Sequence, residues 1–344
     1  MTQISIKDIA KRADVSIATV SRVLNNKGNV KPATLVRVRE AMDFYHYEPN
    51  QNARALVGGT TQTIGLFYPA DKAGNYSNLF SEGYTLELMR GVTDQLNGTG
   101  YSLYLINDTE TGSAGSKAGF LKYVEQNRVD GLIFLHVNGD KAFQAGLDSL
   151  RSARFPFTYA GERINSGDIN VYAHYTEYMR NILLQLLEAG HRQILYTGIS
   201  SDIRLSGILK ELKKHYSDME ITFADHAAFT SDSMLKASIE KNIHKNRITA
   251  SFSDLYINTV RLLYSFASLG LAVPGDISVA GVVHSQEQLA LTANISSALV
   301  PSREMGRELA RLLLERIKDP DSAPRQADFH PVFYDRGSIS SVKV

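Results

Sequence analysis

The chain has 344 residues, of which 43% are hydrophobic and 21% charged, a balance that is typical of a globular protein and excludes a disordered one. It contains no cysteine, which excludes disulfides, thiolate metal sites and a cysteine nucleophile. No apolar run approaches the roughly 18 residues that a membrane span needs, and the first residues are polar, so we expect a cytoplasmic protein.

The net charge of +1 is unevenly distributed along the chain. Residues 1–60 carry nine Lys and Arg against five Asp and Glu, a net charge of +4, and the remainder carries 28 against 31, a net charge of −3. A short basic segment on a mildly acidic body is expected when one end of a protein contacts a polyanion, although a random excess on so short a segment stays open. The length favours two or three domains.

Two short helices are predicted at the start of the chain. Ser5 and Asp8 are typical of a helix start, with Ser5 as the N-cap. Apolar residues then recur at helical spacing and form one buried stripe, at Ile6, Ile9, Ala10 and Ala13. Ser16 caps a second helix that runs to about residue 25, with an inner face of Val20, Val23 and Leu24. Two helices joined by so tight a turn predict a helix-turn-helix, whose second helix enters the major groove of DNA.

The outer face of the second helix carries side chains that suit DNA. Arg22 can donate two hydrogen bonds to a guanine, and Ile17 and Ala18 suit thymine methyl groups. The helix N-terminus offers amide and hydroxyl donors to phosphate. The alternative for Ile17 is a place in the core. The predicted DNA-binding residues of this module are Ser5, Ser16, Ile17, Ala18, Thr19, Ser21, Arg22 and Asn25.

A third helix and a short capped segment complete this region. The third helix is predicted from Pro32 to about His46, with an apolar stripe at Leu35, Val38, Met42 and Tyr45. Asn50 then caps a segment of about seven residues, 51–57, before two glycines. So short a helix is unstable alone in water, and we expect it to fold only against DNA and a partner chain.

The sequence of this region resembles the LacI/GalR repressor family. The resemblance rests on DIAKRADVSIATVSRVLN, followed at the family's distance by YEPNQNARAL, and runs without gaps from Ser5 to Leu56. It implies a hinge at Asn50, Ala53 and Leu56 that contacts DNA, with Ala53 and Leu56 in the minor groove and Leu56 of each subunit wedged into a central CpG step. An apolar wedge of this kind unstacks a pyrimidine–purine step and kinks the duplex.

From residue 61 onward, short apolar runs alternate with amphipathic stretches. Buried strands are predicted at 63–68, 101–106, 130–135 and 155–160, and in a second set at 193–198, 220–224, 247–252 and 277–282. Helices are predicted at 82–97, 115–127, 140–152, 175–189, 203–216, 231–243 and 255–269. This alternation predicts an α/β fold of two doubly wound lobes, which hold a ligand outside the carboxyl ends of their strands.

The resemblance implies that the two lobes are similar to periplasmic sugar-binding proteins. We expect a helix-turn-helix domain at 1–49, a hinge and linker at 50–60, and an effector-binding and dimerisation domain at 61–344. The first lobe is expected to comprise about 61–160 and 292–320, and the second about 163–288 and 323–344. The chain would then cross between the lobes near 160–163, 283–292 and 320–328.

The resemblance also implies some of the effector contacts. Arg204 follows from the stretch GISSDIRLSG, and Asp254 from SDLYINTVRLL. A guanidinium such as that of Arg204 can bind vicinal hydroxyls or a carboxylate. Phe80 is a candidate for stacking on the ligand, with a core role as the alternative.

Two positions depart from the family. The aspartate that the family places after one strand is absent, because those positions hold Val282, Val283 and His284. The family's Asp-Asn after the fifth strand is replaced by Ala173 and His174. These changes argue against a standard monosaccharide pose. His174 and His284 are therefore candidates for contacting a different ligand, with the alternative that both are surface histidines.

Taken with the resemblance, these features predict a ligand-controlled repressor. It would act as a homodimer on a pseudo-palindromic DNA operator, with a sugar or sugar derivative as effector. The alternative is a catabolite-control regulator whose corepressor is a phosphorylated carrier protein, although the helix that holds Arg303 and Arg307 shows no clear basic docking pair.

No enzyme and no cofactor or metal site is predicted. The sequence has no Gly-rich phosphate loop, no GxSxG elbow and no HExxH spacing. The last residues, 339–344, lack the leucine heptads of tetrameric family members, which favours a dimer.

Overall fold

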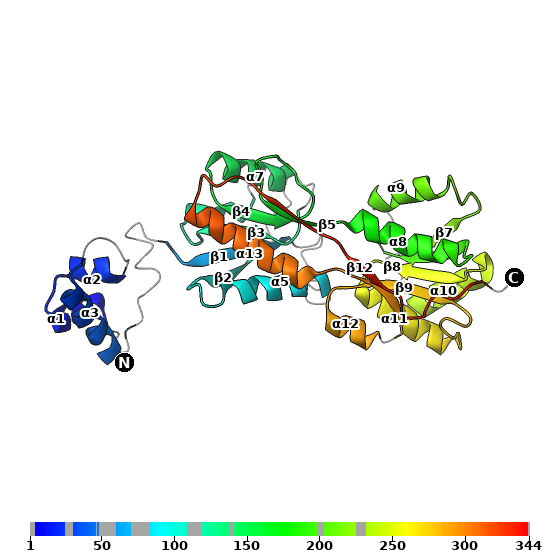
Figure 1. The fold of residues 1–344 in the computed structure, drawn as a ribbon, viewed down its shortest axis with the longest axis horizontal. Coiled ribbons are helices and arrows are strands. Elements are labelled where there is room, and N and C mark those ends of the chain that lie inside the picture. The colour runs from blue at the N-terminus through cyan, green and yellow to red at the C-terminus, as the bar shows by residue number, and fades with distance from the viewer. Residues whose placement is uncertain are drawn as a thin grey trace.

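The chain folds into a small helical module followed by two α/β lobes (Figure 1). The structure is a computed structural model, and it describes residues 4–24, 30–45, 47, 60–69, 83–108, 118–137, 141–198, 203–224, 232–292 and 294–342. No helix within these ranges is long and apolar enough to cross a membrane.

Three helices form the N-terminal module: α1 (Ile6–Ala13), α2 (Ile17–Leu24) and α3 (Pro32–Phe44). Asp14 ends α1 in the left-handed conformation, with φ of 50°, and so turns the chain into α2. The core confirms the stripes expected from the sequence except at Leu35, which is half-buried and is not one of its members. Its buried members are Ile9, Ala10, Ala13, Val20, Val38 and Ala41, and Ile6, Val23, Leu24, Met42 and Tyr45 pack against them.

The first lobe is built on a six-stranded sheet in which all neighbouring strands pair in parallel. In spatial order its strands are β11 (Gln326–Phe329), β5 (Asn170–Ala173), β4 (Phe157–Ala160), β3 (Gly131–Phe134), β1 (Thr63–Pro69) and β2 (Ser102–Asp108). Helices α5 (Gly83–Leu96) and α13 (Ser302–Lys318) cover one face, and α6 (Leu121–Glu125) and α7 (Lys141–Ser152) cover the other. The sheet is therefore buried on both sides, as parallel sheets usually are.

The second lobe repeats this plan. Its strands are, in spatial order, β12 (Val332–Tyr334), β10 (Ser296–Leu299), β9 (Ser278–Val283), β8 (Ala250–Ser253), β6 (Gln193–Thr197) and β7 (Glu220–Phe223). Only the edge strand β12 is antiparallel. Helices α8 (Tyr175–Glu188) and α9 (Ile203–Leu212) pack on one face, α10 (Asp232–Asn246) and α11 (Tyr256–Ser268) on the other, and α12 (Gln286–Leu291) follows β9. The predicted fold class is confirmed.

The strand pairing corrects the expected crossing points between the lobes. After β4 the chain stays in the first lobe, because β5 pairs with β4 and β11. After β9 it stays in the second lobe, because β10 pairs with β9. The chain therefore crosses between β5 and α8, between β10 and α13, and between β11 and β12. Strands of four residues carry too little pattern to show which sheet they join, so only the pairing locates the crossings.

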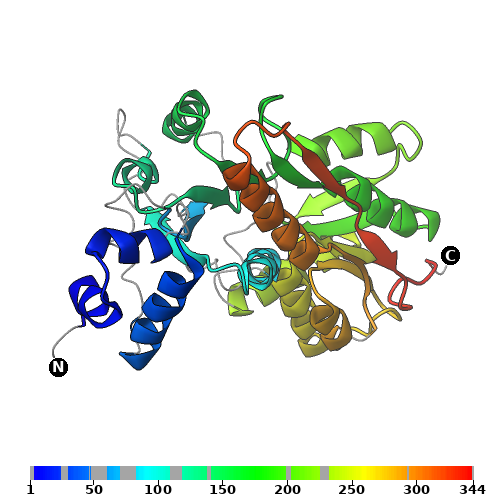
Figure 2. The same cartoon turned by 60° about the vertical axis from the view of Figure 1, so that its left-hand side comes forward.

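Helices α5 and α13 are distant in sequence and lie side by side in the first lobe (Figure 2). A Cβ atom at Gly91 of α5 would lie 1.9 Å from the carbonyl oxygen of Arg303, and one at Gly306 of α13 would lie 2.1 Å from that of Leu88. Both positions therefore need glycine, because each lets the backbone of the other helix approach closely.

Candidate functional site

The outer face of α2 presents the side chains that the sequence analysis assigned to DNA. Ile17 is 45% exposed, and Ala18 and Arg22 are exposed as well, while Val20 on the opposite face is fully buried. Ile17 is therefore not a core residue. Within the described residues Arg22 has neither a hydrogen bond nor an ion pair, so its guanidinium is available to a ligand.

Hydrogen bonds at the helix starts hold this face in place. The Asp8 carboxylate accepts from the backbone N–H of Ser5, at 2.9 Å, and from its hydroxyl, at 2.7 Å, which lowers the pKa of Asp8. At the start of α2 the Ser16 hydroxyl accepts from the Thr19 N–H at 3.1 Å and lies 2.9 Å from the Thr19 hydroxyl. Both serines cap their helices as predicted. Ser21 is half-buried on α2.

Several predicted residues lie outside the described part of the chain. These are Asn25 and Phe80 and, in the predicted hinge at 50–60, Asn50, Ala53 and Leu56. Arg204 belongs to α9, and its side chain is likewise outside the description.

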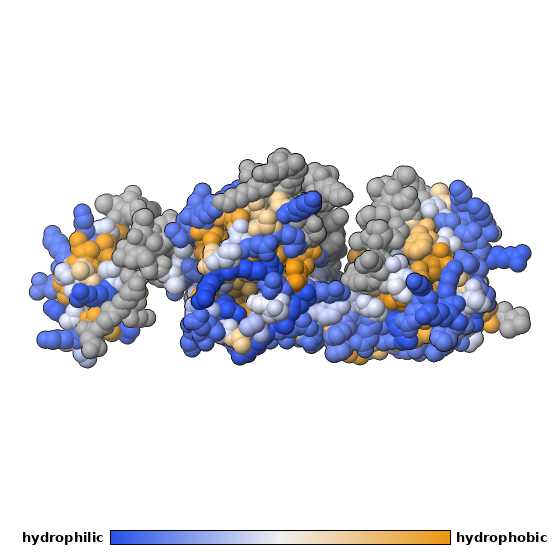
Figure 3. Space-filling view, turned by 90° about the horizontal axis from the view of Figure 1, so that it is seen from above, coloured by the Kyte–Doolittle hydropathy of each residue, from blue (hydrophilic) through white to orange (hydrophobic). Residues whose placement is uncertain are grey.

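Where the two lobes face each other, the surface is notched and the lobes remain joined along one side (Figure 3). A cluster of aromatic rings lies at this junction, just beyond the carboxyl ends of β1, β3 and β9. The Tyr84 ring of α5 is its centre, with ring centroids 5.5 Å from His136, 6.0 Å from Tyr175 and 5.4 Å from His284. Tyr68, at the end of β1, contacts His136 in turn, at 5.2 Å. We call these five residues the junction cluster.

Burial keeps the histidines of the junction cluster neutral. It lowers the pKa of His284 to about 3 and that of His136 to about 4. His284 Nδ1 lies 3.0 Å from the Ser302 hydroxyl, and His136 Nε2 lies 3.2 Å from the Thr85 hydroxyl. Uncharged imidazoles and phenols can exchange hydrogen bonds with hydroxyl or amide groups, but they cannot neutralise an anion.

The remaining effector candidates lie in two other places. Asp254 follows β8 and accepts a 2.6 Å hydrogen bond from the Tyr196 hydroxyl, so it belongs to the second lobe's carboxyl edge. His174 caps α8 at a crossing between the lobes and stacks on His330. Tyr172 touches both His174 and Tyr175, so a run of rings connects His174 to the junction cluster.

Sequence reasoning missed Tyr68, Tyr84, His136 and Tyr175. A signal was present for two of them, since Tyr68 ends a predicted strand and His136 follows one, which is where ligands bind in open α/β sheets. Tyr84 and Tyr175 have no such signal, because each lies in the first turn of an ordinary amphipathic helix.

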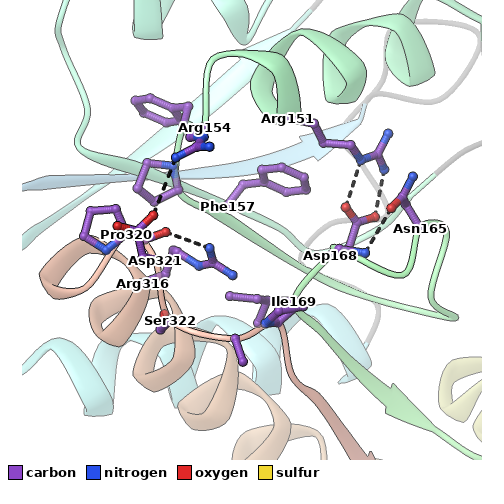
Figure 4. A pocket seen from close by; sticks show the side chains of 15 residues that line it. Arg151, Arg154, Phe157, Asn165, Asp168, Ile169, Arg316, Pro320, Asp321 and Ser322 are labelled. Atoms are coloured by element: carbon purple, nitrogen blue, oxygen red, sulfur yellow. Dashed lines mark hydrogen bonds and ion pairs between the residues drawn. The ribbon is translucent and has the colours of Figure 1, made fainter.

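A cavity of about 430 Å³ opens at the other end of the first lobe's sheet, at the amino ends of β4 and β5 (Figure 4). Its wall contains a buried ion pair, in which Arg151 donates two hydrogen bonds to Asp168, at 2.8 and 2.7 Å. The Tyr159 hydroxyl adds a third, at 3.0 Å, and its pKa is raised by burial. Arg151 also donates to Asp148, at 2.5 Å, so its guanidinium is held between two carboxylates, which indicates a structural role for this pair.

The surface of α5 and α13 carries a second arginine group. Arg303 donates to both carboxylate oxygens of Asp94, at 2.7 and 3.1 Å, and Arg307 donates to one of them, at 2.8 Å. These hydrogen bonds lower the pKa of Asp94. The two guanidinium groups therefore lie together on α13 and share one carboxylate.

Two family models match the chain. The model described as "Bacterial regulatory proteins, lacI family" matches residues 5–50, and the model described as "Periplasmic binding protein-like domain" matches residues 183–339. Among relatives, the "HTH-type transcriptional repressor PurR" of Pectobacterium atrosepticum is 29% identical over 98% of this chain and 97% of its own length. "Catabolite control protein A" of Priestia megaterium is 26% identical over 90% of this chain and 91% of its own length.

Solved structures agree with the fold. A transcriptional regulator CelR–cellobiose complex is similar with a TM-score of 0.62 and 24% identity, covering 97% of this chain and 99% of that one. The lac repressor dimer bound to operator and an anti-inducer is similar with a TM-score of 0.74 and 19% identity, covering 98% and 100%. The first family model describes regulatory proteins and the PurR relative is named as a transcriptional repressor, which confirms the expectation of a regulator rather than an enzyme.

Proposed function

This chain belongs to the LacI family of bacterial regulatory proteins, and from that premise we propose that it is a homodimeric repressor controlled by a small sugar-like effector. The observation that carries the proposal is the pairing of two features in one chain. One is an exposed α2 face on which Arg22 has no ion-pair partner among the described residues, and the other is the junction cluster at the facing edges of two parallel sheets. The first suits a DNA groove and the second a small ligand.

The DNA contacts that we propose follow from the shape of α2. Arg22 would bind a guanine edge, and Ile17 and Ala18 would contact thymine methyl groups in the major groove. The hinge at 50–60, through Asn50, Ala53 and Leu56, would enter the minor groove at a central CpG step. One such module buries too little surface for tight binding, so two copies would bind two half-sites of a pseudo-palindrome.

A homodimer is supported by apolar side chains that the described surface leaves exposed. Leu86 of α5 and Tyr104 and Leu105 of the edge strand β2 are each between 38% and 42% exposed. Large apolar residues on an edge strand and its neighbouring helix are a liability in a monomer, and a second copy would cover them.

The effector would lie against the junction cluster. Sugars carry apolar C–H faces that pack on aromatic rings and hydroxyls that bond neutral imidazoles and phenols, so the cluster suits an uncharged carbohydrate. Arg204, Asp254 and Phe80 would complete the site, with His174 at its rim. The solved relative with cellobiose supports this ligand class.

Ligand control would act through the lobes. An effector that binds one arrangement of the lobes better than another shifts the population between them. That shift would order or melt the hinge at 50–60, which is too short to be helical alone. A coupling of about 1–3 kcal/mol would change operator affinity about 5- to 150-fold.

A catabolite-control regulator is the second candidate, and the structure offers one observation in its favour. Arg303 and Arg307 do lie together on an exposed helix face, which the sequence alone did not reveal. A phosphorylated carrier protein could bind this pair by displacing Asp94. The relative named catabolite control protein A is consistent with this candidate.

The proposal is tested by fluorescence anisotropy with a labelled palindromic duplex that has a central CpG step. We expect tight, salt-sensitive binding that Arg22→Ala and Leu56→Ala weaken and that Arg154→Ala, an exposed arginine of the first lobe, leaves unchanged. One compound from a panel of sugars and sugar phosphates should change affinity at least tenfold. Absence of any duplex binding would contradict the proposal.

A separate variant tests the proposed effector site. Tyr84→Ala should reduce the response to that compound without changing DNA affinity in its absence, whereas Tyr264→Ala, an exposed tyrosine of α11, should retain the response. Binding that ignores every sugar but increases with a phosphorylated carrier protein, and that Arg303→Ala abolishes, would favour the second candidate.

A further inference from the structure

Four side chains that can bind metals converge where two of the crossings between the lobes run side by side. His174 and Glu177 belong to the start of α8, and Asp328 and His330 belong to the end of β11 and the crossing after it. The His174 N–H donates to the Phe329 carbonyl at 3.0 Å, so a backbone hydrogen bond ties the two crossings together at this point. We call these four residues the crossing cluster.

The distances within the crossing cluster are short enough for a common ligand. One donor atom from each of His174, Glu177 and His330 lies within 4.8 Å of the other two. His330 Nδ1 is 2.9 Å from Glu177 Oε2, and His174 Nε2 is 3.7 Å from Asp328 Oδ1. Donors on a tetrahedral zinc ion, with bonds of about 2.1 Å, are about 3.4 Å apart, so no separation within the cluster must shorten by more than about 1.4 Å.

The side chains have the freedom to close that gap. The two imidazole rings are parallel, with an angle of 6° and centroids 4.2 Å apart, and each must turn about its outer torsion to point a nitrogen at one ion. That torsion is broad and soft in histidine. The side chains of His174, Glu177 and His330 are 35%, 50% and 62% exposed, so they can turn and an ion can reach them from solvent.

We propose that the crossing cluster is a binding site for a divalent transition-metal ion, with zinc as the probe. Two imidazoles and a carboxylate are donors that zinc, copper and nickel prefer, whereas magnesium and calcium prefer a shell of oxygens. His174, Glu177 and His330 supply three ligands, and Asp328 is placed to be a fourth or to orient His174. A bound ion links the two crossings and so stabilises one arrangement of the lobes.

Sequence spacing gave no hint of this site, because its donors come from two segments far apart in the chain. His174 also lies at the rim of the proposed effector site, but zinc binding requires neither DNA nor sugar, so the test needs neither ligand and uses variants of Glu177 and His330 alone. The full-length protein, with any histidine tag removed, is titrated with zinc by calorimetry and by competition with a chromogenic zinc chelator. Wild type is compared with His330→Gln, Glu177→Gln and a control, His215→Gln, whose side chain is exposed and lies outside the cluster.

We expect one zinc ion per wild-type chain, no competition from magnesium at millimolar concentration, and unchanged binding by His215→Gln. His330→Gln and Glu177→Gln should each bind at least tenfold more weakly. Zinc should also raise the thermal unfolding temperature of wild type and not that of His330→Gln, which circular dichroism must show to be folded. Failure of wild type to bind zinc, or equal binding by wild type and His330→Gln, would overturn the proposal.

Discussion

The buried imidazole of His284 makes the stability of the two-lobe body depend on pH. In the folded chain its pKa is about 3, because burial disfavours the charged form, whereas an unfolded histidine has a pKa near 6.5. Below pH 6.5 the unfolded state therefore binds more protons than the folded state, and stability falls as the pH falls. Protonation of this histidine in the unfolded state lowers the free energy of unfolding by about 1.4 kcal/mol at pH 5.5 and by almost nothing at pH 7.5.

Substituting His284→Gln removes that proton site while keeping a side chain that can bond the Ser302 hydroxyl. Urea unfolding at pH 7.5 and 5.5, followed by circular dichroism because the chain has no tryptophan, gives the free energy of unfolding at each pH. We expect wild type to lose about 1.4 kcal/mol more than the variant over this interval. Ser302→Ala, which keeps the imidazole, should behave like wild type. An equal loss in wild type and His284→Gln would refute the reasoning, because it would mean that the folded state accepts the proton.

Three further predictions test packing, the buried ion pair and DNA binding. Gly91→Ala should destabilise the first lobe by more than about 3 kcal/mol, because the added Cβ atom would collide with the backbone of α13. Its control is Gly207→Ala in α9, where no atom lies within 4 Å of the added Cβ, and this change should stabilise the protein by up to about 1 kcal/mol. Thermal unfolding measures both effects. Asp168→Asn should cost about 3–5 kcal/mol in urea unfolding, because it removes the buried carboxylate and leaves Arg151 only the exposed one of Asp148. Asp148→Asn should cost under about 1 kcal/mol, because that carboxylate is exposed. Arg22→Ala should weaken operator binding by about 1–3 kcal/mol and relax the base preference at one position of the operator. Affinities for a set of duplexes with single base-pair substitutions measure both effects. An equal loss of affinity for every duplex would instead indicate that Arg22 contacts a phosphate.

The N-terminal helical module shows which features a local sequence pattern can predict. The stripes of α1, α2 and α3 come from apolar residues three and four apart, and the caps at Ser5 and Ser16 come from side chains that bond their own helix starts. These interactions are local, so the sequence predicted them within a few residues. The strands at 63–69 and 193–197 were found for the same reason, since a buried parallel strand is a continuous apolar run.

The features that the sequence did not reveal depend on contacts between distant segments of the chain. Strands β5, β10, β11 and β12 have three or four residues each, and which sheet they join is decided by hydrogen bonds to strands elsewhere in the chain. The misplaced crossing points follow directly from this. Sequence alone also could not show that Arg303 and Arg307 converge on Asp94, because that contact needs the close approach of α5 and α13.

The junction cluster and the crossing cluster likewise combine features that the sequence predicts with contacts that it cannot show. The sequence by itself determined the class of protein and the exposed face of α2, and it predicted DNA contacts on that face and a ligand at the carboxyl edges of the strands, because each depends on a local motif or on a rule that holds for open α/β sheets. Only the tertiary structure decided that Tyr84 meets His136 and His284, and that His174 meets His330. Those contacts join segments that are separate in sequence, and side-chain chemistry across such distances is set by how the strands pair and where the chain crosses between the lobes.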